Sequence, residues 1–191
     1  ETTCTWARPA RGTSGVDSFY RYNPLSNQYQ FVDLPDSFGT PPDYKIGSGS
    51  SQNIMFQYLT NSSLEKLSIK RWNLSDLSIV ETSDPNNVID ISWPSDEYFL
   101  ASVACVVDDN TLLLNSININ NDPSTGKIYK LVINEDDSYT LTFLFDLLSD
   151  QNYWRSVIFS NNKIIYQRGD LTNHIVQRDY TTLDIELEID I

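Results

Sequence analysis

The sequence feature that most constrains the fold is a pair of alternating aromatic and polar runs within residues 19–35. Alternation with a period of two residues is typical of a β-strand that presents one polar and one apolar face. The short segment between the two runs is rich in Asn, Pro and Ser, which is the composition of a turn. Residues 19–35 are therefore predicted to form a β-hairpin.

The same hairpin pattern returns three more times along the chain, at intervals of about 45–60 residues. The residues that align at the hairpin turns are Asn23, Asn73, Asn134 and Asp179. A second, more apolar kind of unit precedes the later hairpins. These units align on Asn53, Asn110 and Asn162. The chain is therefore predicted to be a repeat of paired hairpins.

An inner apolar hairpin followed by an outer alternating hairpin is the layout of a four-stranded propeller blade. Inner strands have neighbours on both faces, whereas outer strands lie next to water and need polar alternation. We expect an all-β, β-propeller-like single domain over residues 1–191, and a β-sandwich is the alternative. The expected blade-like units cover about 1–40, 41–84, 85–148 and 149–191. The second outer hairpin is expected to pair 67–72 with 77–81, and 35–49 and 83–97 are expected to be loops. The only stretch compatible with a short helix is 144–150.

The first of these units is expected to be incomplete. Only about 17 residues precede the first outer hairpin, which leaves room for a single inner strand. An unpaired sheet edge invites strand addition. Three sources could complete the sheet: the C-terminal strand 183–191, the N-terminal segment, or a neighbouring molecule.

Residues 20–29 resemble the outer hairpin of kelch-like propeller blades, in which an aromatic-rich strand, an Asn-Pro turn and a Tyr-bearing return strand recur. The chain lacks the paired glycines that kelch blades carry on an inner strand. The resemblance therefore implies blade geometry alone. Four blades in 191 residues are also similar in size to a hemopexin-type four-bladed propeller.

The charge balance excludes some classes of partner. The chain carries 13 Lys and Arg against 26 Asp and Glu, for a formal net charge of -13, and has no basic run. Nucleic acids and anionic membrane surfaces are bound by clustered Lys and Arg, so neither is an expected partner. No stretch approaches the ~18 consecutive apolar residues of a membrane span, so membrane insertion is not expected.

Several features are typical of a secreted or cell-surface glycoprotein. The chain starts at Glu1, as after removal of a signal peptide, although a cut piece of a longer chain would look the same. Cys4 and Cys105 suffice for one disulfide, and Asn61 and Asn73 begin N-glycosylation acceptor triplets. An oxidised disulfide fits that compartment. The alternative is a cytosolic protein with two free buried cysteines.

In a four-bladed ring, Cys4 and Cys105 would fall on inner strands of the first and third blades. These blades face each other across the axis. A disulfide across the central channel is therefore geometrically conceivable.

Chemistry-bearing residues are sparse. The single histidine, His174, has no recognisable triad or zinc partners in the sequence, so no catalytic residue is predicted. Carboxylates in two strand-connecting turns could gather around a calcium ion, although Asp is also a preferred turn residue. These calcium candidates are Asp108, Asp109, Asp136 and Asp137. No other cofactor or metal is expected.

Most of the aromatic side chains are expected to pack in the core or between blades, and stacking on sugars is the alternative. The candidates are Tyr20, Tyr22, Tyr29, Trp72, Trp93, Tyr98, Tyr153 and Trp154. From all these features we expect a non-enzymatic extracellular structural or adhesion module. Its partners would be other protein subunits, copies of itself included, joined into a fibre or matrix by completion of the open blade. The alternatives are a lectin-like propeller that binds glycans and a glycoside hydrolase that uses acidic residues.

Overall fold

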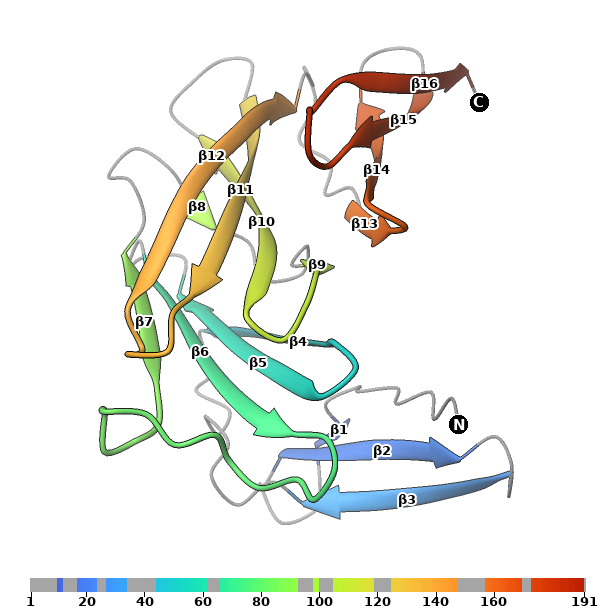
Figure 1. Cartoon of the computed structure of the whole chain (residues 1–191). Helices are drawn as coiled ribbons and strands as arrows, with labels where there is room; N and C mark the ends of the chain where they lie inside the picture. Colours follow the sequence, from blue (N-terminus) through green and yellow to red (C-terminus); the bar gives the residue numbers. More distant parts are fainter. Residues whose placement is uncertain are drawn as a thin grey trace.

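The computed structural model describes residues 10–11, 17–23, 27–33, 44–61, 66–92, 98–99, 105–118, 125–147, 157–169 and 173–190. Within these ranges every regular element is a β-strand, which confirms the all-β prediction. The same ranges contain no helix that could span a membrane. The strands form four antiparallel sheets that follow one another along a curved row (Figure 1).

The strands follow the chain from one sheet to the next. Sheet A contains β1 (Ala10–Arg11), β2 (Asp17–Asn23) and β3 (Gln28–Asp33). Sheet B contains β4 (Tyr44–Ser50), β5 (Ile54–Asn61), β6 (Lys66–Asn73) and β7 (Ile89–Ser92). Sheet C contains β8 (Tyr98–Phe99), β9 (Cys105–Val106), β10 (Thr111–Asn118), β11 (Thr125–Ile133) and β12 (Tyr139–Leu147). Sheet D contains β13 (Val157–Ser160), β14 (Lys163–Gly169), β15 (Asn173–Asp179) and β16 (Ile185–Asp190).

Sheet C has the same plan as sheets B and D, although it contains one strand more. Both β8 and β9 pair with β10, at different places: Phe99 lies opposite Ser116, and Cys105 lies opposite Leu113. The two short strands therefore occupy one strand position. Sheets B, C and D each have four strand positions in chain order, which is the arrangement of blade-like repeats.

Sheet A has three strands among the described residues, in agreement with an incomplete first unit. The N-terminal segment supplies β1, whose Ala10 pairs with Ser18 of β2. The C-terminal strand β16 pairs with β15 in sheet D. Of the three sources considered for the missing strand, the C-terminal strand is therefore not the one that completes sheet A.

The predicted register of the outer turns is confirmed by the backbone. Asn73 and Asp179 end the third strand of their sheets, Asn23 ends the equivalent strand of sheet A, and Asn134 directly follows β11. A residue with positive φ follows within each turn. These residues are Asn27 (φ 52°), Leu77 (62°), Asp137 (64°) and Leu183 (64°). The left-handed conformation lets the chain reverse within a few residues. The inner units also agree, because Asn53, Asn110 and Asn162 directly precede β5, β10 and β14.

One predicted strand is wrong. Residues 77–81 were expected to return alongside β6, but they form only an isolated bridge between Ile79 and Trp72. Leu77 has a φ of 62°, which a strand does not accommodate. The partner of β6 is instead β7, in a segment expected to be a loop, because Ile89 and Ile91 are buried there between sheets B and C.

Two further segments differ from expectation. Residues 44–50 form β4, although 44–49 were expected to be part of a loop, and the glycines of this strand permit close packing. A Cβ added at Gly49 would lie 2.9 Å from Cγ2 of Val106 on β9. Residues 144–147, expected to allow a helical turn, continue β12. Phe145 of this segment is buried against sheet D, and this packing favours the extended chain.

Hydrophobic cores lie between successive sheets. One cluster joins sheets B and C and includes Phe56, Ile69, Leu112 and Leu131. A second cluster joins sheets C and D through Leu113, Ile128, Phe145, Val157, Ile164, Tyr166 and Val176. Burying the apolar residues of sheets B, C and D against one another holds these three sheets together.

Candidate functional site

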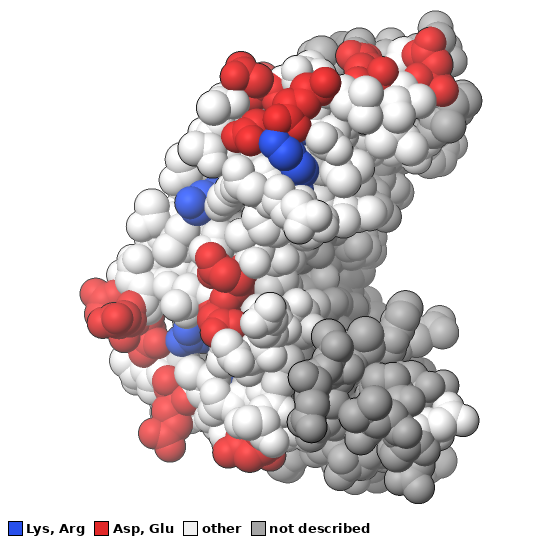
Figure 2. All heavy atoms as spheres, turned by 45° about the vertical axis from the view of Figure 1, so that its right-hand side comes forward, with Lys and Arg blue, Asp and Glu red and all other residues white. Residues whose placement is uncertain are grey.

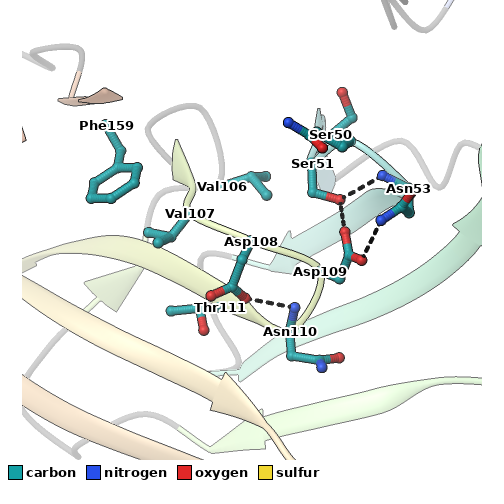
Figure 3. A pocket seen from close by; sticks show the side chains of 11 residues that line it. Ser50, Ser51, Asn53, Val106, Val107, Asp108, Asp109, Asn110, Thr111 and Phe159 are labelled. Atoms are coloured by element: carbon teal, nitrogen blue, oxygen red, sulfur yellow. Dashed lines mark hydrogen bonds between the residues drawn. The ribbon is translucent and has the colours of Figure 1, made fainter. Parts of the chain in front are cut away.

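An open depression of about 790 Å³ lies where the inner turns of sheets B and C approach the first strand of sheet D (Figure 3). The lining residues are Ser50, Ser51, Gln52, Asn53, Val106, Val107, Asp108, Asp109, Asn110, Thr111 and Phe159. The depression is polar at the two Asn-bearing turns and apolar at the two valines and Phe159. The repeat itself builds it, because Asn53 and Asn110 are equivalent positions of neighbouring units.

Asp109 joins the two turns. Its Oδ1 accepts a short hydrogen bond from Oγ of Ser51, and its Oδ2 accepts one of 2.7 Å from Nδ2 of Asn53. Ser51 is held in turn by the backbone N–H of Ile54, at 2.9 Å from its Oγ. These bonds, chiefly the one from Ser51, hold the pKa of Asp109 below its ordinary value. Asp109 is therefore ionised at neutral pH and cross-links sheets B and C.

Asp108, the neighbouring calcium candidate, stabilises the turn in which it lies. Its Oδ1 accepts a hydrogen bond of 2.9 Å from the backbone N–H of Asn110. Although Asp108 and Asp109 are adjacent in sequence, they bond to different groups. Among the residues that the structure describes, no three His, Cys, Asp or Glu side chains gather into a metal-binding group. Calcium binding in this turn stays a prediction.

The other two calcium candidates lie in the outer turn of sheet C. Asp136 accepts hydrogen bonds from the N–H of Ser138 at 3.1 Å and from its Oγ at 2.5 Å, which lower the pKa of Asp136. Asp137 instead pairs with Arg71 of sheet B at 3.3 Å. Asp76 and Ser78 repeat the first arrangement in sheet B, with bonds of 2.9 and 2.8 Å. Asp136 therefore has the same role in the outer turn of sheet C as Asp76 has in that of sheet B. Asp137 instead connects sheet C to sheet B.

The two glycosylation candidates occupy different settings. Asn73 is half-buried at the end of β6, and its Nδ2 donates a hydrogen bond of 2.9 Å to Oγ of Ser78. Asn134 makes the equivalent bond of 2.8 Å to Ser138 in sheet C. A glycan on Asn73 would replace one of the amide protons beside this bond. Asn61 ends β5, but its side chain lies outside the described residues. Glycosylation at both positions stays a prediction.

Cys105 lies half-buried on β9 and forms no disulfide with any residue that the structure describes, while Cys4 lies outside the described residues. Burial raises the pKa of the Cys105 thiol. Because one partner is not described, the disulfide between Cys4 and Cys105 stays a prediction.

His174 is tied to the last strand of the chain. Its Nδ1 lies 2.5 Å from Oδ1 of Asp190 and 3.5 Å from Oε1 of Glu188, both on β16. Asp190 is also the cross-strand neighbour of His174 in the sheet. The imidazole therefore lies beside two carboxylates of the neighbouring strand, and this contact links β15 to β16.

Trp72 packs in the core, as was expected for most of the aromatic residues, and does not present a face to sugars. Trp72 is buried with Met55 on one face of sheet B, because Leu74 and Ile79 pack over it. The side chains of the other aromatic candidates lie outside the described residues. These are Tyr20, Tyr22, Tyr29, Trp93, Tyr98, Tyr153 and Trp154.

The aromatic residue that lines the depression is Phe159, which the sequence did not single out. It is half-buried and lies edge-to-face with Tyr180, with 5.0 Å between the ring centroids. Phe159 belongs to an apolar strand followed by Asn161 and Asn162. Its position just before an inner turn is the only sequence signal that could have indicated it.

Comparisons with known proteins give little further information. No protein-family model and no curated protein matches the sequence. Among solved structures, the chain is similar to prolyl oligopeptidase B from Galerina marginata at 11% identity, with a TM-score of 0.48. The match covers 99% of this chain and 26% of that chain. At this level of similarity we transfer neither activity nor site residues from that enzyme.

Proposed function

We propose that the protein is a non-enzymatic extracellular module of kelch-like blade repeats that binds other protein subunits through the surfaces of its sheets. One observation carries this proposal. Of the six large hydrophobic side chains exposed among the described residues, five lie in the last sheet. They are Ile158, Ile175, Ile185, Leu187 and Ile189. Exposed apolar side chains grouped in one sheet are typical of protein interaction sites.

The placement outside the cell rests on sequence features. They are the cysteine pair Cys4 and Cys105 and the acceptor residues Asn61 and Asn73. Peptide mapping of protein from its native source tests both features. The proposal expects glycan at Asn61 or Asn73 and a disulfide-linked peptide pair. Unmodified asparagines together with two reduced thiols would contradict secretion.

The binding role is tested by mild chemical cross-linking of the native protein before extraction, followed by size separation. We expect the chain to migrate in a protein assembly, whether with itself or with other subunits. A glycosidase and peptidase screen on the same preparation tests the non-enzymatic assignment, which turnover above a heat-inactivated control would contradict. A chain that stays uncross-linked and monomeric in its native setting would contradict the binding role.

A second function, carbohydrate binding, is favoured by the composition of the depression. Sugar sites in proteins combine an aromatic face with planar polar groups that exchange hydrogen bonds with hydroxyls. Phe159, Asp109 and Asn110 provide these groups along one open surface (Figure 3). A glycan array, with and without calcium, tests this function. Binding lost in Phe159→Ala but kept in Phe143→Ala, a change at an exposed aromatic outside the depression, would support it.

A further inference from the structure

Each sheet of the repeat has two faces. One is directed toward the sheet that follows it in the chain, and the other toward the sheet that precedes it. Phe56 and Leu113 lie three residues after the aligned residues Asn53 and Asn110. Phe56 packs in the core between sheets B and C, and Leu113 packs in the core between sheets C and D. This face is called the leading face. The third residue after Asn162 is Ile165, so the same register defines the leading face of sheet D.

The opposite, trailing face follows the same register. Leu112 and Ile164 lie two residues after Asn110 and Asn162, and each packs toward the preceding sheet. The outer hairpins agree. Leu131 and Ile133, three residues and one residue before Asn134, are buried against sheet B. Successive sheets therefore join by a leading face against a trailing face.

The leading face of sheet D carries a group of apolar residues beside the ion-paired Lys163, Asp179 and Glu186. Cross-strand pairing places Ile158 opposite Ile165, and Ile175 opposite Ile189. Leu187 lies opposite Gln177, which itself lies opposite Ile165. Four of these side chains are exposed, at 54% for Ile158, 37% for Ile175, and 46% each for Leu187 and Ile189. Ile165, the residue equivalent to Phe56 and Leu113, is half-buried, whereas Phe56 and Leu113 are 0% exposed.

This apolar group thus has the composition of an inter-sheet contact, and it lies on the face through which sheets B and C form such contacts. Apolar residues grouped on one sheet face are what sheet packing requires. The surface therefore continues an existing series of interfaces. The partner that fits it is the trailing face of another sheet of the same repeat.

In sheet A of this chain, the sequence register places aromatic residues at the positions of such a trailing face. Tyr22 and Tyr20 lie one and three residues before Asn23, the positions that Ile133 and Leu131 hold before Asn134. The backbone register pairs Tyr22 with Tyr29 and Tyr20 with Phe31. Four aromatic positions are therefore grouped in the hairpin of sheet A. Sheets A and D lie at opposite ends of the curved row (Figure 1), so a second copy is needed to bring them together.

We propose that the leading face of sheet D binds sheet A of a second copy of this chain. The contact is head to tail, and two such contacts close a dimer with twofold symmetry. This proposal rests on the proposed role as a protein-binding module and names its partner.

Charge sets a condition on the assembly. Each copy has a formal net charge of -13, and Figure 2 shows acidic side chains in several groups on the visible surface with few Lys or Arg among them. Two copies therefore repel each other at long range, and salt screens this repulsion. An apolar contact between like-charged copies becomes tighter as the ionic strength rises. An assembly held by ion pairs would become weaker instead.

Sedimentation of the full chain over a concentration series, at low and high salt, tests the proposal. We expect a monomer–dimer equilibrium that tightens with salt. Leu187→Lys should weaken it by about tenfold or more, because a charge then lies in the buried contact. Phe143→Lys is the matched control, since Phe143 is 48% exposed on sheet C outside this face, and it should dimerise normally. A chain that is monomeric at all concentrations would overturn the proposal.

A mixing experiment identifies the two surfaces. Tyr22→Lys should also weaken the dimer, and an equal mixture of Tyr22→Lys and Leu187→Lys should regain part of the affinity, because one of the two contacts is intact in the mixed dimer. Tyr29→Lys replaces Tyr22→Lys if the latter loses its circular dichroism spectrum. If sheet A variants dimerise normally and mixing restores nothing, the head-to-tail contact is wrong. A monomeric chain that is still cross-linked to a different protein would overturn this inference and leave the proposed function standing.

Discussion

The guanidinium of Arg71 on β6 lies 3.3 Å from the carboxylate of Asp137 in the outer turn of sheet C. Arg71 is only 8% exposed, and its Nη1 also lies 3.4 Å from Oδ1 of Asn110. Asp137 accepts a further hydrogen bond of 2.8 Å from the backbone N–H of Ser83. Burial lowers the pKa of Arg71, and Asp137 opposes that shift. One buried ion pair therefore connects sheet B, sheet C and the segment that follows β6.

Asp137→Asn should destabilise the fold by about 3 kcal/mol, because it leaves a largely buried guanidinium without its counter-charge. Asparagine tolerates the positive φ of 64° at this position, so the backbone of the turn is kept. Urea unfolding measures the loss. Asp136→Asn, in the same turn but at an exposed side chain, is the control and should cost less. Equal losses in the two variants would show that the ion pair contributes nothing specific.

Gly49→Ala should destabilise the protein by about 1–3 kcal/mol, because the added Cβ would lie 2.9 Å from Cγ2 of Val106. Val106→Ala in the same chain removes the clashing methyl group. The double variant should therefore lose less stability than the two single variants added together, measured by thermal or urea unfolding. Simple additivity would contradict the close approach of β4 to β9.

Tyr58 should ionise late in an alkaline titration. Its hydroxyl is buried between sheets B and C, and burial raises its pKa from 10.0 to about 12. Since the unfolded chain ionises this group near 10, the folded state loses stability as the pH rises from 10 toward 12. Ultraviolet difference spectroscopy and unfolding at alkaline pH measure both effects. Tyr58→Phe should remove the late ionisation step, and a titration unchanged by Tyr58→Phe would contradict the burial.

Asp179 should stabilise the folded state at neutral pH and lose this contribution in acid. Its hydrogen bond with Lys163, at 2.9 Å, and the backbone N–H groups of Thr182 and Thr181 lower its pKa from 3.8 to about 2. The lowered pKa means that this stabilisation is complete above the ordinary value and is lost as the pH falls toward 2. The melting temperature of Asp179→Asn should therefore fall less steeply over this interval. Asp184→Asn, which removes a charge from the same turn, is the control.

Much of the fold could be predicted because strands have a simple period and turns a narrow chemistry. The alternation in residues 19–35 and the spacing of the Asn and Asp turn residues predicted the hairpins. The errors have physical causes. Residues 77–81 have strand composition, but Leu77 adopts a positive φ and Ile79 covers Trp72, which only the packing of the chain reveals. Glycine-rich composition predicted a loop at Gly47 and Gly49, but both residues pair with β5 and belong to strand β4.

The surfaces were harder to predict than the strands. Alternation showed that Ile175, Leu187 and Ile189 lie on strands, but not whether another sheet covers them. The depression was missed because Asp109, Ser51 and Phe159 come from three different sheets. Long-range contacts of this kind leave no local pattern in one sequence.

The measurement that tests the central claim most directly is photo-cross-linking from the leading face of sheet D. A benzophenone amino acid in place of Leu187 reacts with whatever covers that position. The expected result is a cross-linked dimer whose adducts map to residues 17–33 of the second copy. Adducts confined to residues 157–190, or a chain that forms no cross-linked dimer at any concentration, would contradict the claim.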